Sequence, residues 1–217
     1  MNSTFIMRPY LSCVLLLCAL SFLSTVCVQD SFILEKKLIS LKCSSPRAAG
    51  KEVSFVMIHY CSDAVESPSK PYSVEKITSV FERYGVSAHY LVDRDGKVYQ
   101  LVEENRTAFH AGKGKLPFAP YHENSLNGIS IGIELMAIGT RQEMKLLNVG
   151  SGYDKIAKTD IGFTEMQYKT LRALLNDIQK RHPKVLNNRK HIVGHDEYAP
   201  SRRPDPGSLF EWSKIGL

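Results

Sequence analysis

Two histidines and an aspartate, far apart in the sequence, are candidate ligands of a metal site, although a single histidine is more often a hydrogen-bonded core or surface residue. His59 stands near the end of the apolar run 53–60, while His195 and Asp205 lie in the segment GHDEYAPSRRPDPG at 194–207. Two imidazoles and a carboxylate suit a catalytic zinc ion, because they leave its fourth position open for water. Zinc lowers the pKa of that water to about 7. The prolines of the segment stiffen the return from His195 to Asp205.

A carboxylate stands inside a second apolar run. Glu134 lies at 129–135, between Ile133 and Leu135, where a charge is costly unless it has a partner. In an enclosed site such a carboxylate is suited to carry protons. The alternative is a strand carboxylate paired with a surface lysine, but its apolar neighbours make an ion pair alone a weak reason for its presence.

Five segments of the chain resemble a known enzyme family. In the same order along the chain, from about residue 53 to 212, they are similar to the zinc-dependent N-acetylmuramoyl-L-alanine amidases of the phage-lysozyme and peptidoglycan-recognition-protein superfamily. The segments are IHY at 58–60, SAHYLVDRDG at 87–96, FHAG at 109–112, NGISIGIEL at 127–135 and the run 194–207.

The resemblance implies a role for each candidate residue. His59, His195 and Asp205 would bind one zinc ion, and Glu134 would take a proton from the attacking water and pass it to the leaving nitrogen. Arg203 occupies a position that is usually lysine in the catalytic members, and would face the developing oxyanion. The expected reaction is hydrolysis of the amide between N-acetylmuramic acid and L-alanine, in peptidoglycan or in muropeptides.

Three further residues are candidates for substrate binding. His110 and Asn127 lie in segments that resemble the family's substrate cleft, although each is equally suited to anchor a loop. His89 has the same strand parity as Leu91. A hydrogen-bonded buried histidine is therefore as good an interpretation of His89 as a substrate contact.

Two other classes of function remain to be weighed. The first is a non-catalytic peptidoglycan-binding module, but members of the superfamily that only bind cell wall typically lack one zinc ligand, and all three are present. The second makes Cys61 a nucleophile, with a histidine as base. No thiol-protease motif surrounds Cys61, so we expect it to be structural or to pair with Cys43.

Periodicity and capping residues predict the elements that position these side chains. The runs 53–60 and 129–135 and the shorter 190–193 are buried strands, and Asp95-Gly96 is a hairpin turn between two β-rich arms. We expect helices at 74–84, from Thr164 to about 181, and at 209–215. The stretch 137–162 has no clear pattern, and we hypothesise that it borders the substrate cleft.

Helices that alternate with strands, one pair of which forms a hairpin, predict an α/β fold. We expect a single domain at 53–217, with a central mixed β-sheet flanked by helices and the zinc site at the strand ends. Residues 29–52 form a lead segment. We expect the protein to be a monomer.

The first residues have the pattern of a secretory signal. Arg8 precedes an apolar run at 11–23 that is too short to span a bilayer comfortably, which predicts a signal peptide at 1–28 and an exported, periplasmic or extracellular protein. Cys27 could instead be lipidated and attach the protein to a membrane, although Val26 before it is unusual for that signal.

The chain is moderately basic. Its formal charge of +6 becomes +5 without residues 1–28, which hold one arginine and no acid. For an exported protein, anionic cell-wall polymer or lipid headgroups are better partners for this charge than nucleic acid. A basic surface with no partner at all is an equally open interpretation.

Overall fold

The computed structural model describes residues 31–217. Strand β3 (Phe55–Cys61) is the strand around which the site is built. It lies between β7 (Ser130–Met136) and β8 (Ile192–Gly194), and both neighbours run parallel to it. The full sheet has six strands in the order β1-β5-β4-β7-β3-β8, and β5 runs antiparallel to β4. The sheet is therefore mixed, as the sequence predicts.

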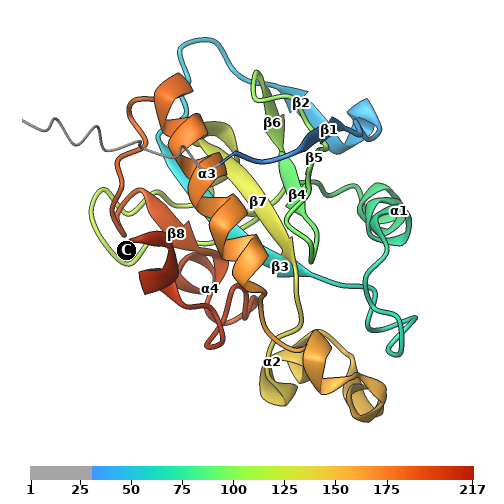
Figure 1. The fold of residues 1–217 in the computed structure, drawn as a ribbon. Coiled ribbons are helices and arrows are strands. Elements are labelled where there is room, and N and C mark those ends of the chain that lie inside the picture. Colours follow the sequence, from blue (N-terminus) through green and yellow to red (C-terminus); the bar gives the residue numbers. More distant parts are fainter. Residues whose placement is uncertain (1–30) are drawn as a thin grey trace, which may run out of the picture.

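Helix α3 (Glu165–Arg181) covers one face of this sheet (Figure 1). Its capping box forms as predicted, because the Thr164 hydroxyl accepts from Gln167 N and the Gln167 side chain accepts from Thr164 N. The leucines and isoleucine of its apolar face are fully buried against β3, β4 and β7. Each such side chain stabilises the fold by about 1.5–3 kcal/mol. They are Leu171, Leu174, Leu175 and Ile178.

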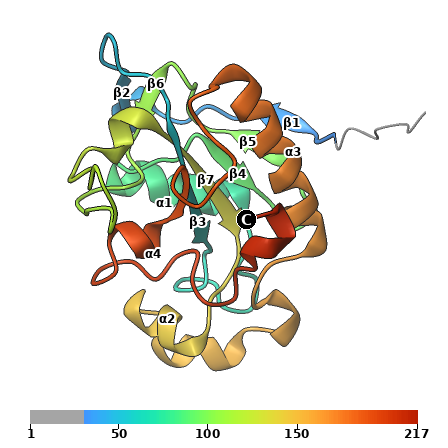
Figure 2. The same ribbon diagram turned by 90° about the vertical axis from the view of Figure 1, so that its left-hand side faces the viewer.

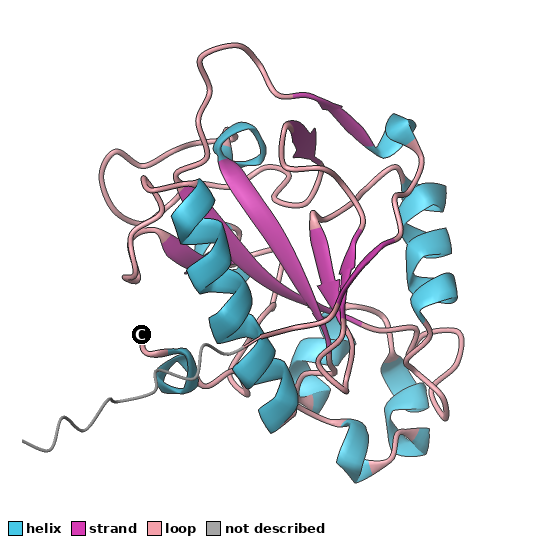
Figure 3. Cartoon of the chain, turned by 45° about the horizontal axis from the view of Figure 1, so that its top comes forward, coloured by secondary structure: helices cyan, strands magenta, loops and turns pink. Residues whose placement is uncertain are grey.

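Helix α1 (Val74–Tyr84) packs against the opposite face, so the strands lie between α1 and α3 in Figure 3. It begins after Ser73, whose hydroxyl accepts from Lys76 N, and ends at Gly85 in the left-handed conformation. Both ends agree with the prediction. Tyr84, in the last turn, does not pack against the sheet and is 70% exposed.

The predicted hairpin joins β4 (Tyr90–Val92) to β5 (Val98–Gln100). Gly96 in its turn has a φ of +82°, a conformation that favours glycine. A Cβ there would also lie 2.6 Å from the hydroxyl oxygen of Thr170 on α3. The turn therefore requires glycine both for its backbone and for its contact with the helix.

The structure corrects several expected elements. The stretch 137–162 contains α2 (Arg141–Leu146), whose capping box begins at Thr140, and two 3₁₀ turns. The closing helix expected at 209–215 is a single 3₁₀ turn at Trp212–Ile215. Figure 2 shows the α2 segment at the end of the sheet where β7 finishes.

The lead segment contributes to the sheet as well. Strand β1 (Leu34–Lys36) pairs with β5, and β2 (Ser44–Pro46) pairs with β6 (Arg106–Ala108) in a separate two-stranded sheet. Among residues 31–217 no helix is long and apolar enough to cross a membrane. The predicted signal peptide at 1–28, with Cys27, lies outside the described residues.

Candidate active site

His59 and Glu134 lie side by side on the face of the sheet opposite α3. They are direct neighbours in the parallel pairing of β3 with β7. The residues that flank them in sequence, Ile58 and Ile133, point to the other face and pack in the core under α3, as the alternation of a strand requires. This register places an imidazole and a carboxylate together near the ends of two central strands.

His195 follows the end of a third strand, β8, and the loop after it brings Asp205 back beside His195. Strand β8 stops at Gly194, and His195 begins the short helix α4 (His195–Tyr198). The loop that follows is tied back to its start by a hydrogen bond of 2.6 Å from Asp196 N to Asp205 O. This bond holds Asp205 next to His195.

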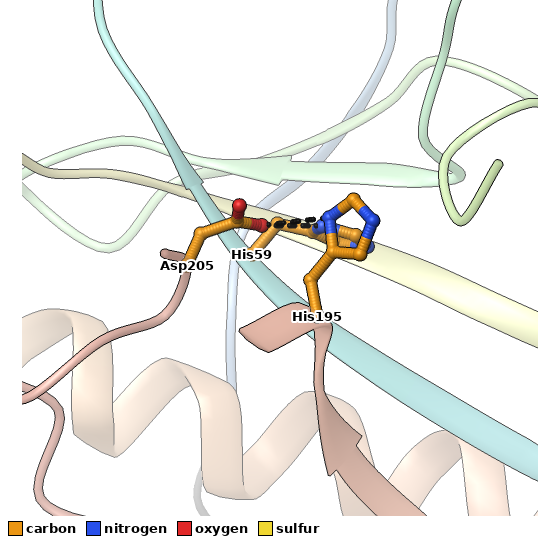
Figure 4. Close-up of side chains that lie close together, drawn as sticks. All are labelled: His59, His195 and Asp205. Carbon is orange, nitrogen blue, oxygen red and sulfur yellow. Dashed lines mark hydrogen bonds and ion pairs between the residues drawn. The ribbon is translucent and has the colours of Figure 1, made fainter. Parts of the chain in front are cut away.

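His59, His195 and Asp205 converge on one point, as Figure 4 shows. Asp205 Oδ2 lies 2.8 Å from His59 Nδ1 and 3.0 Å from His195 Nδ1. All three side chains are buried, and their ligand atoms lie within 4.8 Å of one another. The three predicted ligands therefore meet at the strand ends, where they could hold one metal ion.

The hydrogen-bond pattern tests whether these residues fit a cation. His195 Nε2 lies 2.9 Å from the carbonyl oxygen of Ala111, which can only accept. The single N–H of a neutral His195 ring is therefore on Nε2, and Nδ1 presents a bare lone pair. That lone pair faces the carboxylate oxygen of Asp205. Two electron-pair donors this close are favourable only with a proton or a metal ion between them, and two imidazoles with a carboxylate are a donor set that fits a metal.

Burial sets the charge state of His59. It lowers the pKa of the imidazole to about 4, despite the neighbouring Asp205 carboxylate. A neutral imidazole at pH 7 is the form that binds metal ions.

Glu134 presents a carboxyl group to the same point. Burial, followed by the negative charge of Asp205, raises the pKa of Glu134 to about 8. Glu134 as a whole is partly exposed, but its Oε2 atom is enclosed and has no hydrogen-bond partner among residues 31–217. No lysine is paired with it, contrary to the structural alternative. A carboxyl group with a pKa near the working pH can accept and donate a proton.

Arg203 and Arg202 differ although they are neighbours. The Arg202 guanidinium is fixed by hydrogen bonds to the carbonyl oxygens of Ala111 and Lys113. Arg203 lines the cleft beside Glu134, and its Nε is buried without a hydrogen-bond partner in the described part of the chain. Its positive charge acts to lower the pKa of Glu134. Arg203 is therefore the guanidinium that remains available to a group in the cleft.

These residues line a cleft of about 740 Å³, within the range of sites for small ligands. Its outer walls are largely apolar side chains from α1 and from the α2 segment. The cleft-bordering role hypothesised for 137–162 thus agrees with the structure. The apolar wall residues are Val80, Tyr84, Leu146, Leu147 and Val149.

The three residues predicted to bind substrate have other partners. His89 is fully buried and does not line the cleft, since its Nδ1 accepts from Gly132 N and its Nε2 lies 3.2 Å from Arg106 O. Asn127 Oδ1 accepts from the backbone of His110 and Ala111. His89 and Asn127 therefore have the alternative roles considered for them, as a buried histidine and a loop anchor.

His110 lines the cleft but uses both ring nitrogens within the protein. Its Nδ1 lies 3.1 Å from His59 Nε2, and its Nε2 lies 3.0 Å from Ser130 Oγ. Sequence reasoning did not single out Ser130 or Arg202. Nothing in the sequence marks either one, because their partners are distant along the chain.

Cys61 does not have the properties of a nucleophile. Burial and the nearby Glu134 carboxylate raise the pKa of its thiol well above the ordinary value, so the thiolate is disfavoured. Cys61 and Cys43 are both free thiols, and the structure has no disulfide between them.

Comparison with known proteins shows the same architecture. Residues 49–208 match the sequence profile of a family described as N-acetylmuramoyl-L-alanine amidase. The chain is 31% identical over 175 residues to the 1,6-anhydro-N-acetylmuramyl-L-alanine amidase AmpD of Haemophilus influenzae, a match that covers 76% of this chain and 81% of AmpD.

Two solved structures are similar to most of this chain. A selenomethionine derivative of AmpD aligns with a TM-score of 0.58 at 26% identity, covering 83% of this chain and 92% of that one. Escherichia coli AmiD, in complex with the substrate anhydro-N-acetylmuramic acid-L-Ala-D-gamma-Glu-L-Lys, aligns with a TM-score of 0.55 at 28% identity. That match covers 77% of this chain and 58% of AmiD. The predicted fold, a mixed sheet flanked by helices, is confirmed.

Proposed function

Because this chain belongs to the N-acetylmuramoyl-L-alanine amidase family, we propose that it hydrolyses the amide between N-acetylmuramic acid and L-alanine by a zinc-dependent mechanism. Membership of this family makes the chain an amide hydrolase rather than a non-catalytic binding module. The observation that carries the zinc proposal is the convergence of His59, His195 and Asp205 beside the enclosed carboxyl group of Glu134.

The three ligands suit zinc by their chemistry. Two imidazole nitrogens and one carboxylate oxygen are a typical catalytic set, with room for one further ligand. When bound there, zinc supplies Lewis acidity and lowers the pKa of water to about 7. His195 contributes a bare Nδ1 atom, His59 contributes a neutral imidazole whose Nδ1 faces the same point, and Asp205 contributes the negative charge.

Glu134 is the proposed proton carrier. A carboxylate in this position accepts a proton from the attacking water and then delivers it to the nitrogen of the leaving L-alanine, so the products are a free lactyl carboxylate and a free amine. The enclosure of its Oε2 keeps bulk water from competing for that proton. Its raised pKa, near 8, suits both halves of the transfer.

Arg203 is proposed to stabilise the negative charge that develops on the amide oxygen. The guanidinium is always protonated and presents a rigid set of N–H donors. Its Nε is buried and has no hydrogen-bond partner within residues 31–217, which supports this role. Where the catalytic members usually have lysine, a guanidinium holds the oxyanion by electrostatic attraction and cannot donate a proton to it.

The proposed substrate is peptidoglycan or a muropeptide released from it. AmiD, a similar protein, has been solved with an anhydro-muropeptide bound, and the cleft has the volume for a ligand of several residues. The sequence pattern at 1–28 supports the further proposal that the protein is exported to meet this substrate. We also propose that the chain acts as a monomer and does not bind nucleic acid.

Mass spectrometry of the products tests this function. Purified protein is incubated with intact sacculi and, separately, with anhydro-muropeptides, each with and without a chelator. We expect free stem peptide and a lactyl carboxylate, and we expect the chelator to abolish both products. A Glu134→Gln variant gives the background rate. Cleavage at a glycosidic or peptide bond instead, or full activity after metal removal, would contradict the proposal.

A further inference from the structure

We infer that Ser130, acting through His110, fixes the proton of the His59 ring on Nε2 and thereby keeps His59 Nδ1 bare for the metal. Ser130 and His110 are then positioning residues, which act on the metal site through His59 rather than by binding the metal. The inference rests on the proposed function in taking a metal to be the partner of His59 Nδ1, but the hydrogen-bond chain itself is independent of which metal binds.

The chain of hydrogen bonds starts at the hydroxyl group of Ser130. Its oxygen lies 2.6 Å from the carbonyl oxygen of Leu126 and 3.0 Å from His110 Nε2. A carbonyl oxygen only accepts, so the one hydroxyl proton points to Leu126. Ser130 Oγ must therefore accept its second hydrogen bond, and His110 Nε2 carries the proton that it accepts.

The same logic passes through His110 to His59. A neutral imidazole that donates from Nε2 has an acceptor at Nδ1, and His110 Nδ1 lies 3.1 Å from His59 Nε2. His59 donates to it, which places the His59 proton on Nε2. The other nitrogen, Nδ1, then presents its lone pair 2.8 Å from Asp205 Oδ2.

The position of the His110 ring is specified by two further features. Asn127 Oδ1 accepts from the backbone N of His110 at 3.1 Å and from that of the next residue at 2.8 Å. Gly132 on β7 lies against the ring, since a Cβ there would be 2.5 Å from His110 Cγ. Gly132 is not among the glycines with positive φ. Glycine is therefore needed at this position to leave space for the His110 ring, and not to allow an unusual backbone conformation.

The direction of these hydrogen bonds, from His59 to His110 to Ser130, matters for metal binding. If His110 donated from Nδ1 instead, His59 would accept at Nε2 and carry its proton on Nδ1, the atom that faces Asp205. The metal would then have to displace that proton. The second histidine ligand is fixed independently, since His195 Nε2 faces the carbonyl of Ala111. Outer hydrogen bonds of this kind are typically worth about 10- to 100-fold in metal affinity.

Nitrogen-15 NMR of histidine-labelled protein reads the proton positions directly. Long-range proton–nitrogen spectra are recorded on the metal-free protein and on the zinc-loaded protein. We expect His110 to be protonated on Nε2 in both states, and His59 to be protonated on Nε2 in the zinc-loaded state. A His110 ring that carries its proton on Nδ1 in the metal-free protein would overturn the inference.

Zinc affinity, measured by competition with a chelating dye, tests the consequence. Ser130→Ala should weaken zinc binding by about 10- to 100-fold, and Ser130→Thr, which keeps the hydroxyl, should recover most of it. Thr170→Val is the matched control, because it also removes a buried hydroxyl that donates to a backbone carbonyl, and Thr170 on α3 neither lines the cleft nor contacts a metal ligand. It should bind zinc as the wild type does.

Gly132→Ala is an independent variant that keeps every polar atom of the Ser130–His110–His59 hydrogen bonds and only displaces the His110 ring. It should weaken zinc binding as well. Equal zinc affinity in Ser130→Ala and Thr170→Val would overturn the inference. If the wild type binds no zinc, the proposed function fails instead, and the His110 proton position still decides the inference. The same NMR result decides it if Ser130→Ala does not fold.

Discussion

His59 and Glu134 are paired directly across β3 and β7, the two central parallel strands of the sheet. Both therefore point to the same face, and a slip of one residue in the pairing would send one of them into the core under α3. The adjacent pairs on the other face are apolar and fully buried, as Ile58 opposite Ile133 illustrates. The packing of the core thus fixes the spacing of the two polar side chains.

Replacing Glu134 by glutamine should separate catalysis from metal binding. The amide has a similar shape but cannot accept a proton from water, so we expect turnover to fall by about 100-fold or more. Zinc content, measured by mass spectrometry of the metal, should stay near one per chain. The thermal midpoint should be unchanged or higher, because a carboxylate with an unpaired buried oxygen is removed. A collapsed thermal transition would favour a structural role for Glu134.

Replacing His195 by alanine should remove the metal and the activity together. His195 supplies one of three ligands, and its other ring nitrogen is tied to the backbone of Ala111. We expect zinc to fall from about one ion per chain to a small fraction of that after dialysis. His122→Ala is a suitable control, since His122 lies outside the ligand cluster and contacts Phe55. Stoichiometric zinc in the His195 variant would show that the ligand assignment is wrong.

Much of this architecture can be predicted from local sequence signals. The ends of α1 follow from Ser73 and Gly85, because a side-chain cap and a left-handed glycine are properties of single residues. The start of α3 follows from the capping box at Thr164. The metal ligands could be proposed because each one follows an apolar run or lies close to another ligand in the sequence.

The rest of the fold and of the site depends mainly on contacts between residues that are distant in the sequence, which local patterns do not show. Strands β1, β2 and β6 have three residues each, too few to show a period of two. Helix α2 has only six residues and little apolar periodicity, so the T-x-x-E capping motif at Thr140 is its single local signal. The Ser130–His110 contact joins residues 20 positions apart. Only the folded chain shows that His89 is enclosed while His110 borders the cleft.

Glu104 should make the stability of the protein sensitive to acid. Burial alone would raise its pKa, but hydrogen bonds from Arg181, Tyr90 and His182 outweigh burial and lower the pKa to about 2. A carboxyl whose pKa is depressed on folding stabilises the protein above its unfolded pKa, near 4.3, and loses this contribution as the pH falls towards 2.

Glu104→Gln tests this dependence through denaturant titrations at several pH values. We expect the variant to be less stable by on the order of 2–3 kcal/mol at pH 7, since one pKa unit corresponds to about 1.36 kcal/mol. The difference should shrink below pH 4. Glu103→Gln is the control, because Glu103 is 43% exposed in a loose pair with Lys36 and exposed pairs contribute little. A difference that does not depend on pH would contradict the charge-based explanation.

The apolar wall from the α2 segment should contribute to substrate affinity. Leu146 lines the cleft and is 67% exposed, so Leu146→Ser removes apolar contact surface without opening the core. We expect KM for polymeric peptidoglycan to rise by up to about tenfold, the effect of roughly 1.4 kcal/mol of lost contact, with kcat nearly unchanged. Leu186→Ser is the control, since Leu186 is 51% exposed and does not line the cleft. Equal KM values in both variants would exclude this wall as a binding surface.

Arg203 gives the sharpest test of how the oxyanion is held, because a lysine is usual at this position in the catalytic members of the family. An arginine cannot serve as a proton donor, so its contribution must be electrostatic. Arg203→Ala should lower kcat by about 100- to 1000-fold, the usual cost of removing one oxyanion donor, while zinc content stays unchanged. Arg203→Lys restores the charge without the planar group and should retain more activity than alanine does.

Arg202→Ala is less suitable as a control, because its guanidinium holds the carbonyl of Ala111 that orients His195. Arg83→Ala, which removes an exposed arginine paired with Glu66, should have the wild-type kcat. If Arg203→Ala turns over a muropeptide at the wild-type rate with its zinc confirmed, the guanidinium has no catalytic role, and the metal and Glu134 are sufficient for the reaction.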